Sequence, residues 1–161
     1  MTPFAITAPP RILFGRGEAA KAPGLIRAYG GRGLLVHGTD RSRAEWLIDA
    51  LGPGVLTITC RGEPTLPDLM AALGQSRDWQ PDWVAALGGG AVLDLGKALA
   101  ALIPASGDPM QHLELVGNGQ PLTTDPVPFI ALPTTAGTGA EVTRNAVIGL
   151  PDHGRKVSLR D

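Results

Sequence analysis

Short apolar segments alternate with helix-like segments along this chain, and this alternation limits the folds open to it. Largely apolar runs predict buried strands at residues 11–14, 34–37, 55–59, 83–87 and 129–132. Apolar or amphipathic patterns predict helices at residues 18–29, 43–51, 66–79 and 92–102, with Thr65 and Asp68 suited to cap the third. Buried strands separated by helices indicate an α/β fold, in which helices cover both faces of a parallel sheet. Residues 1–161 are expected to form one such domain.

The charge balance and the apolar pattern exclude several classes of protein. The net charge is −1 and no basic run is present, so no nucleic-acid partner is expected. No apolar run approaches the roughly 20 residues of a membrane span, and residues 1–4 lack the features of a signal peptide. The single cysteine, Cys60, fits a half-buried structural thiol. A cytoplasmic, reducing location is therefore expected.

Three consecutive glycines, Gly88, Gly89 and Gly90, follow one of the apolar runs and precede a helix. Glycines let a backbone approach a pyrophosphate closely, and the start of a helix adds a positive dipole end. A plain strand-to-helix turn needs only one glycine, so an anion-binding loop is the favoured interpretation. Asp94 and Lys97 follow in the same apolar helix, either as a simple ion pair or, as we favour, close to the ligand.

A second loop of small residues, 133–143, follows the apolar run at residues 129–132. Its threonines and glycines leave hydroxyl and backbone N–H groups uncovered, which suits a phosphate-rich ligand. The carboxyl ends of parallel strands meet at one edge of a sheet, where ligands bind. Together with Gly38, which ends another strand, the two loops predict a dinucleotide site.

Other motifs carry less weight. Residues 15–20 match G-x-G-x-x-A, but Arg16 and Glu18 crowd the phosphate position, so this segment is interpreted as a turn. His37, His112 and His153 lack the spacing of metal ligands. His37 either lines the site or is buried at a strand end, and no Ser/His/Asp arrangement is indicated.

Two segments resemble motifs of the iron-containing (group III) alcohol dehydrogenases. Residues 88–98 resemble the family's GGGSxxDxxKA motif, and residues 133–143 are similar to its PTTAGTGSEVT motif, with Ala91 and Ala140 in place of serines. Residues 11–17 and 62–65 resemble the family's N-terminal strand and turn and its G-x-P-T segment. The similarity extends from about Arg11 to Arg160.

The resemblance implies a Rossmann-like parallel sheet, as in the dehydroquinate synthase-like N-terminal domain, that binds NAD or NADP. The family's metal ligands lie on a helical C-terminal domain, and this chain stops at Asp161. It is therefore expected to be the cofactor-binding half of an enzyme for reversible hydride transfer between a small alcohol and NAD(P). Alone it is expected to be inactive, with Fe²⁺ or Zn²⁺ present only in a full-length parent. The residues expected to bind cofactor are Gly38, Asp40, Gly88, Gly89, Gly90, Ala91, Asp94, Thr134, Thr135, Thr138, Asn145, Val147 and Lys156.

Several alternatives stay open. Asp40 is in reach of the adenosine ribose and favours NAD, because an acid there repels a 2′-phosphate; Gly38 in that position, with Arg41 or Arg43, would admit NADP. A polyol dehydrogenase or sugar-phosphate cyclase shares the fold, as in the glycerol dehydrogenase and dehydroquinate synthase relatives. A stand-alone, non-catalytic dinucleotide-binding module is the other alternative. Apolar surface meant for a missing domain would favour a homo-oligomer.

Overall fold

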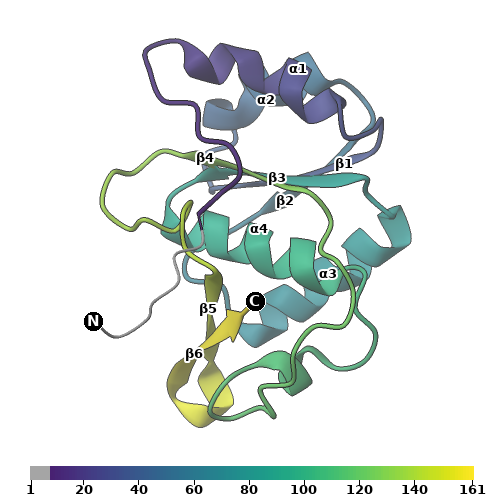
Figure 1. Cartoon of the computed structure of the whole chain (residues 1–161), viewed down its shortest axis with the longest axis vertical. Coiled ribbons are helices and arrows are strands. Elements are labelled where there is room, and N and C mark those ends of the chain that lie inside the picture. Colours follow the sequence, from purple (N-terminus) through teal and green to yellow (C-terminus); the bar gives the residue numbers. More distant parts are fainter. Residues whose placement is uncertain (1–7) are drawn as a thin grey trace, which may run out of the picture.

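A four-stranded parallel sheet, in the order β2-β1-β3-β4, forms the middle layer of the computed structural model (Figure 1). The structure describes residues 8–161, so the expectation for residues 1–4 lies outside it. The strands are β1 (Gly33–His37), β2 (Val55–Thr59), β3 (Trp83–Gly88) and β4 (Phe129–Pro133). His37 lies beside both Thr59 and Leu87 in register, so the carboxyl ends share one edge. The predicted α/β class and these four strands are confirmed.

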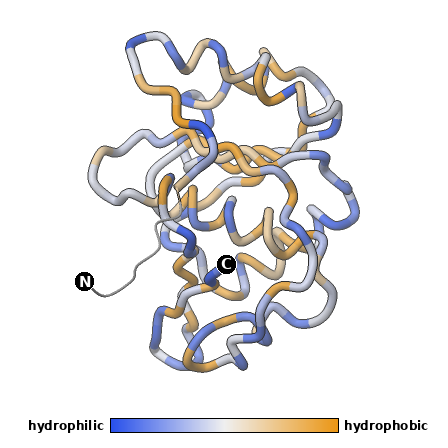
Figure 2. The backbone as a smooth tube through the Cα atoms, viewed as in Figure 1, coloured by the Kyte–Doolittle hydropathy of each residue, from blue (hydrophilic) through white to orange (hydrophobic). Residues whose placement is uncertain are grey.

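Helices cover both faces of the sheet, as the apolar strands require. One face carries η1 (Glu18–Lys21), α1 (Ala22–Arg27) and α2 (Ser42–Leu51), and the other carries α3 (Leu66–Trp79) and α4 (Gly90–Leu102). Successive residues of a strand point to opposite faces of the sheet and so belong to two different cores. Leu35 packs toward α1 and α2, whereas Leu34 packs toward α3 and α4. Hydrophobic colour follows the strands and α4 in Figure 2.

The start of α3 follows the sequence prediction. The Thr65 hydroxyl accepts from the Asp68 N–H at 3.3 Å, and the Asp68 carboxylate accepts from the Thr65 N–H at 3.1 Å. This capping box satisfies two backbone donors. It also fixes the loop between β2 and α3, which borders the candidate site.

Two predictions about the N-terminal part were wrong. Residues 11–14 form no strand; within the described chain no strand pairs with them, and Phe14 is fully exposed. The helix expected at residues 18–29 is split into η1 and α1 and ends at Arg27. Pro23 accounts for the break, because it has no N–H to continue the hydrogen-bond ladder of the preceding turn.

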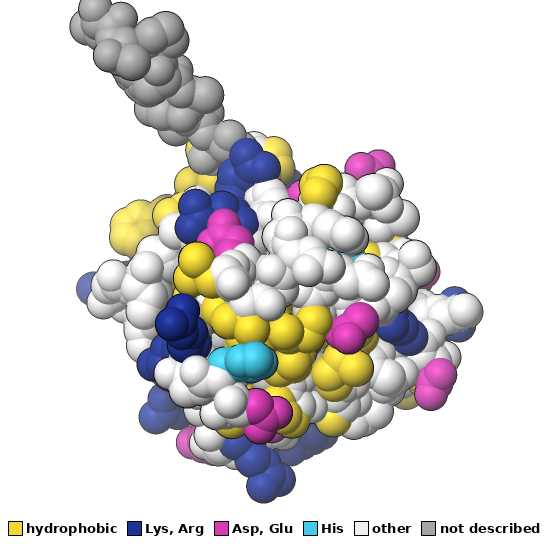
Figure 3. Space-filling view, turned by 90° about the horizontal axis from the view of Figure 1, so that it is seen from below, with side chains coloured by type: hydrophobic (Ala, Val, Ile, Leu, Met, Phe, Trp, Pro, Cys, Tyr) yellow, Lys and Arg dark blue, Asp and Glu magenta, His cyan; other side chains and the backbone are white. Residues whose placement is uncertain are grey.

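A β-hairpin of β5 (Asn145–Leu150) and β6 (Arg155–Arg160), joined by η3 (Pro151–His153), packs against α4. The connection from α4 to β4 contains η2 (Pro109–His112) and is tied to the hairpin by a bridge between Leu113 and Leu159. Seen from below, hydrophobic side chains gather mid-face, with Lys/Arg and Asp/Glu interspersed around them (Figure 3). Among residues 8–161, no helix has the length and apolarity needed to cross a bilayer.

Candidate functional site

A cavity of about 330 Å³ lies between the start of α4, the loop after β4 and the β5–β6 hairpin. Among the predicted site residues it is lined by Gly90, Ala91, Asp94, Thr138, Asn145, Val147 and Lys156. It is also lined by Glu63, Pro64, Ala140, Thr143 and Gly149, to which sequence reasoning gave no site role. A signal for some of these was available, since Glu63 and Pro64 belong to the G-x-P-T segment and Thr143 ends the threonine loop.

The glycine loop joins β3 directly to α4. Gly89 is the N-cap of α4 in extended conformation (φ −78°, ψ −176°), and no side chain caps the helix. The first N–H groups of a helix have no acceptor within it, so this end offers donors and a positive dipole end. A β-carbon at Gly88 would meet Val92 Cγ2 at 2.6 Å, so packing excludes a side chain there.

The threonine loop, residues 134–143, lies against the glycine loop. The Thr134 N–H donates to the Gly88 carbonyl at 2.9 Å, which links the two loops. A β-carbon at Gly90 would lie 3.0 Å from Thr138 Cγ2, so the loops approach as closely as their side chains allow. Thr134, Thr135 and Thr138 are exposed. Exposed hydroxyls and helix-end N–H groups therefore face one edge of the sheet, an arrangement that suits a phosphate-bearing ligand.

Asp94 and Lys97 form the ion pair that the sequence allowed, with Asp94 Oδ1 3.0 Å from Lys97 Nζ. Both side chains are 15% exposed, and Asp94 lines the cavity. The pair is therefore not an ordinary solvated i,i+3 contact on a helix surface. Asp94 therefore lies at the cavity, and the expected position of the pair close to the ligand stays a prediction.

Gly38 and Asp40 lie at the other end of the edge, after β1. Asp40 Oδ1 accepts from the Ser42 hydroxyl at 2.6 Å and from the Ser42 N–H at 3.2 Å, and Oδ2 lies 3.3 Å from Arg43 Nε. The hydrogen bond from the Ser42 hydroxyl lowers the pKa of the Asp40 carboxyl. Both carboxylate oxygens are thus engaged at the start of α2, whereas nothing lies within 4 Å of a β-carbon placed at Gly38.

Two further side chains at this edge are buried. His37 is 2% exposed, and its Nδ1 donates to the Gly38 carbonyl at 2.6 Å. Cys60 is more buried than the half-buried thiol expected, and burial raises the pKa of its thiol. Its Sγ donates to the Gly62 carbonyl at 3.1 Å. Both side chains are therefore held by backbone contacts at strand ends. Within residues 8–161, no group of three or more His, Cys, Asp and Glu is placed to hold a metal ion.

Comparison with known proteins identifies a family for this arrangement. The sequence profile of the iron-containing alcohol dehydrogenases matches residues 9–161. A phosphonoacetaldehyde reductase of Streptomyces viridochromogenes is 42% identical over 123 residues, which are 74% of this chain and 31% of that protein. A 4-hydroxybutyrate dehydrogenase of Cupriavidus necator is 39% identical over 96 residues, 60% of this chain and 25% of that protein.

Solved structures have the same fold. Sulfoacetaldehyde reductase from Bifidobacterium kashiwanohense, in complex with NAD+, superposes with a TM-score of 0.86 at 28% identity, over 100% of this chain and 44% of that one. NADH-dependent butanol dehydrogenase A from Thermotoga maritima also superposes with a TM-score of 0.86. It is 25% identical, and the match covers 100% of this chain and 42% of that one. The chain therefore spans about a third or less of these curated relatives and less than half of these solved chains.

Proposed function

The chain belongs to the iron-containing alcohol dehydrogenase family, and we propose that residues 1–161 are the part of such an enzyme that binds NAD or NADP. The observation that carries this proposal is the meeting of the glycine loop, the threonine loop and the 330 Å³ cavity at one edge of the sheet. The NAD+ bound to a structural relative supports the same ligand class. Fluorescence titration with NADH tests the proposal, and no saturable binding would contradict it.

Each part of the edge takes one part of the proposed ligand. Gly89, Gly90 and Ala91 would hold the pyrophosphate with backbone N–H groups at the start of α4. Thr134, Thr135 and Thr138 would contact phosphate, ribose and nicotinamide, and Asp94 would lie near the nicotinamide end. Asn145, Val147 and Lys156 would close the cavity from the hairpin. A bound nicotinamide would take a hydride from an alcohol carbon or return it to an aldehyde.

The described residues do not fit a metal centre, so no step through a metal follows from them. We propose that Fe²⁺ or Zn²⁺ binds elsewhere in a longer parent protein and that residues 1–161 alone turn over no alcohol. An unassisted alcohol keeps its proton, since its pKa, like that of bulk water, lies far above neutral pH. NADH production with primary alcohols and diols, with added Fe²⁺ or Zn²⁺, measures this. Metal-dependent turnover that survives purification would contradict it.

Cofactor choice depends on which residue faces the adenosine ribose. We propose that Gly38 does so, because it follows β1 directly and has open space beside it, whereas the Ser42 hydroxyl holds the Asp40 carboxylate at the start of α2. NADPH should then bind at least as tightly as NADH. Gly38→Asp should weaken NADPH binding about tenfold relative to NADH, because a carboxylate there repels the 2′-phosphate. Asp40→Asn is the matched control and should leave the ratio unchanged. A preference for NADH that Asp40→Asn removes would assign the position to Asp40.

Two alternatives use the same fold. A polyol dehydrogenase would oxidise the diols in the turnover assay when its metal-binding part is present, and a sugar-phosphate cyclase would not reduce aldehydes. A stand-alone dinucleotide-binding module would bind NADH with no catalytic partner. A reading frame that continues past Asp161 into a histidine-containing helical segment would exclude that module.

We also propose that the chain assembles into a homo-oligomer. Ile12, Leu13 and Phe14 are 63%, 43% and 100% exposed, and they are adjacent in the sequence. Large apolar side chains that are exposed together are typical of an interaction site. Sedimentation velocity over a range of concentrations measures assembly, and a monomer at every concentration would contradict it.

A further inference from the structure

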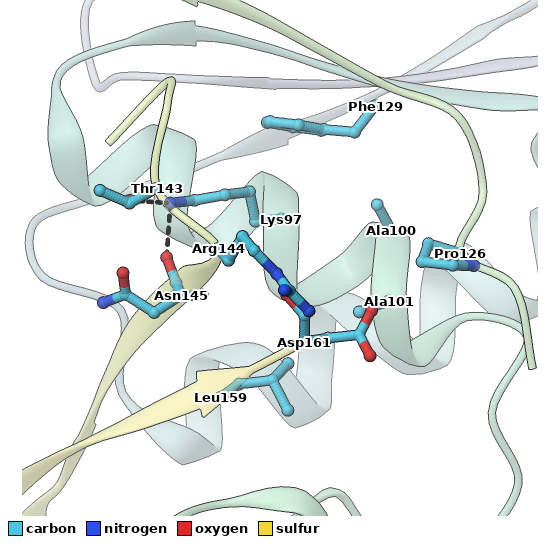
Figure 4. A pocket seen from close by; sticks show the side chains of 11 residues that line it. Lys97, Ala100, Ala101, Pro126, Phe129, Thr143, Arg144, Asn145, Leu159 and Asp161 are labelled. Atoms are coloured by element: carbon cyan, nitrogen blue, oxygen red, sulfur yellow. Dashed lines mark hydrogen bonds between the residues drawn. The ribbon is translucent and has the colours of Figure 1, made fainter. Parts of the chain in front are cut away.

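The ammonium group of Lys97 lies in a cage of four oxygens, and Figure 4 shows its hydrogen bonds to Thr143 and Asn145. Its Nζ is 3.0 Å from Asp94 Oδ1, 2.8 Å from the Ala140 carbonyl and 3.3 Å from Thr143 Oγ1. It also donates to the Asn145 carbonyl. An ammonium has three protons to donate, so the cage satisfies it fully without water.

The oxygens of this cage come from three different segments. Asp94 belongs to α4, Ala140 and Thr143 belong to the end of the threonine loop, and Asn145 begins β5. Those four residues also line the 330 Å³ cavity. Lys97 lines a second hollow of about 160 Å³, which shares Thr143 and Asn145 with that cavity. Lys97 thus contacts the residues that the two spaces share and joins the three segments that line the cavity.

Burial makes these contacts matter. The Lys97 side chain is 15% exposed, so most of its hydration is replaced by the cage. A charge in such a place requires its partners, and removing one side leaves buried polar groups unsatisfied. Lys21 offers a contrast, because it makes an i,i+3 pair with Glu18 at 2.7 Å while 63% exposed. Exposed pairs of that kind add little to stability.

We infer that Lys97 is a positioning residue, which holds the end of the threonine loop and the start of β5 against α4 in the shape that receives the nicotinamide half of the cofactor. The inference rests on the proposed dinucleotide function. Without the clamp, the loop would have to be ordered when the cofactor binds, and that ordering would lower its affinity. The adenosine half, at the far end of the edge, would be unaffected.

Two ligands and a matched pair of variants separate this role from a general loss of structure. In Lys97→Met, affinity for NADH should fall about tenfold or more, while affinity for AMP should stay within about twofold of wild type. Lys21→Met removes the exposed i,i+3 ion pair with Glu18 and should change the affinity for neither NADH nor AMP. Unchanged NADH affinity in Lys97→Met, or an equal loss of AMP affinity, would overturn the inference.

Chemical rescue tests the ammonium itself. Lys97→Ala should lose NADH affinity in the same way and regain it, at least fivefold, when propylammonium is added to fill the cage. Lys97→Met fills the space with an apolar chain and should not respond. Absence of rescue in Lys97→Ala would overturn a role for the positive charge.

Hydrogen exchange on the free protein tests the clamp without any ligand. Amides in residues 140–146 should exchange at least tenfold faster in Lys97→Met, while those of α1 and α2 keep their wild-type rates. Unchanged exchange in residues 140–146 would overturn the clamp. If wild type bound no NADH yet exchange rose as expected, the dinucleotide function would fail, and the role toward the nicotinamide with it.

Discussion

Gly89→Asp should abolish NADH binding without harming the fold. Gly89 has ordinary extended backbone angles, and a β-carbon there would lie 3.5 Å from Thr135 Cγ2, which is normal contact. Aspartate is also a favoured N-cap residue, so it would accept from the free N–H groups of α4 and stabilise the helix. The same carboxylate would occupy the anion position and repel the pyrophosphate. The dissociation constant for NADH should rise at least about 100-fold, about 2.8 kcal/mol.

The measurement is fluorescence titration of NADH alongside thermal melting. Gly89→Asn keeps nearly the same volume and cap without the charge, and should lose less affinity than Gly89→Asp. Gly74→Asp places the charge at an exposed site on α3 with open space, and should bind NADH as wild type does. Equal NADH affinity in Gly89→Asp and wild type would remove the glycine loop from the site.

The sheet and its helices could be predicted because the residues of each buried element carry the pattern of that element themselves. The strands β1 to β4 are largely apolar runs, and the Thr65–Asp68 capping box marks the start of α3. Residues 11–14 were predicted wrongly from the same signal. An apolar run becomes a strand only if another strand hydrogen-bonds to it. The sequence of the run itself does not show whether such a neighbouring strand exists.

The candidate site was predictable in part for a related reason. The glycine and threonine loops stand out because their residue types suit phosphate, and topology brings loops after parallel strands to one edge. The engagement of Asp40 by Ser42 and Arg43 depends on rotamers at the start of α2. The cage around Lys97 depends on the path of the chain between β4 and β5. Neither the contacts of Asp40 nor those of Lys97 can be recognised from a repeating pattern in the sequence.

The close packing of α4 on the sheet predicts that replacing Gly96 with alanine destabilises the protein, although alanine favours a helix more than glycine does. Gly96 lies mid-helix, where alanine would ordinarily be favoured by about 1 kcal/mol. A β-carbon at Gly96 would lie 2.7 Å from Ala86 Cβ and 2.8 Å from Phe129 Cε2. The ring of Phe129 can move slightly, but Ala86 is fixed in β3. Gly96→Ala should therefore lower the free energy of unfolding by about 1–2 kcal/mol, and Gly96→Val by about 3 kcal/mol.

Gly74 provides the matched control, since it is also a helical glycine but has no atom within 4 Å of a built β-carbon. Gly74→Ala should raise the free energy of unfolding by about 0.5–1 kcal/mol, the gain expected when a helix loses an unneeded glycine. Urea denaturation of the wild type and the three variants measures whether the free energy of unfolding falls in the Gly96 variants and rises in Gly74→Ala. If Gly96→Ala proved as stabilising as Gly74→Ala, α4 would not lie as close to β3 as described. The glycine loop that begins α4 would then be placed differently against the threonine loop.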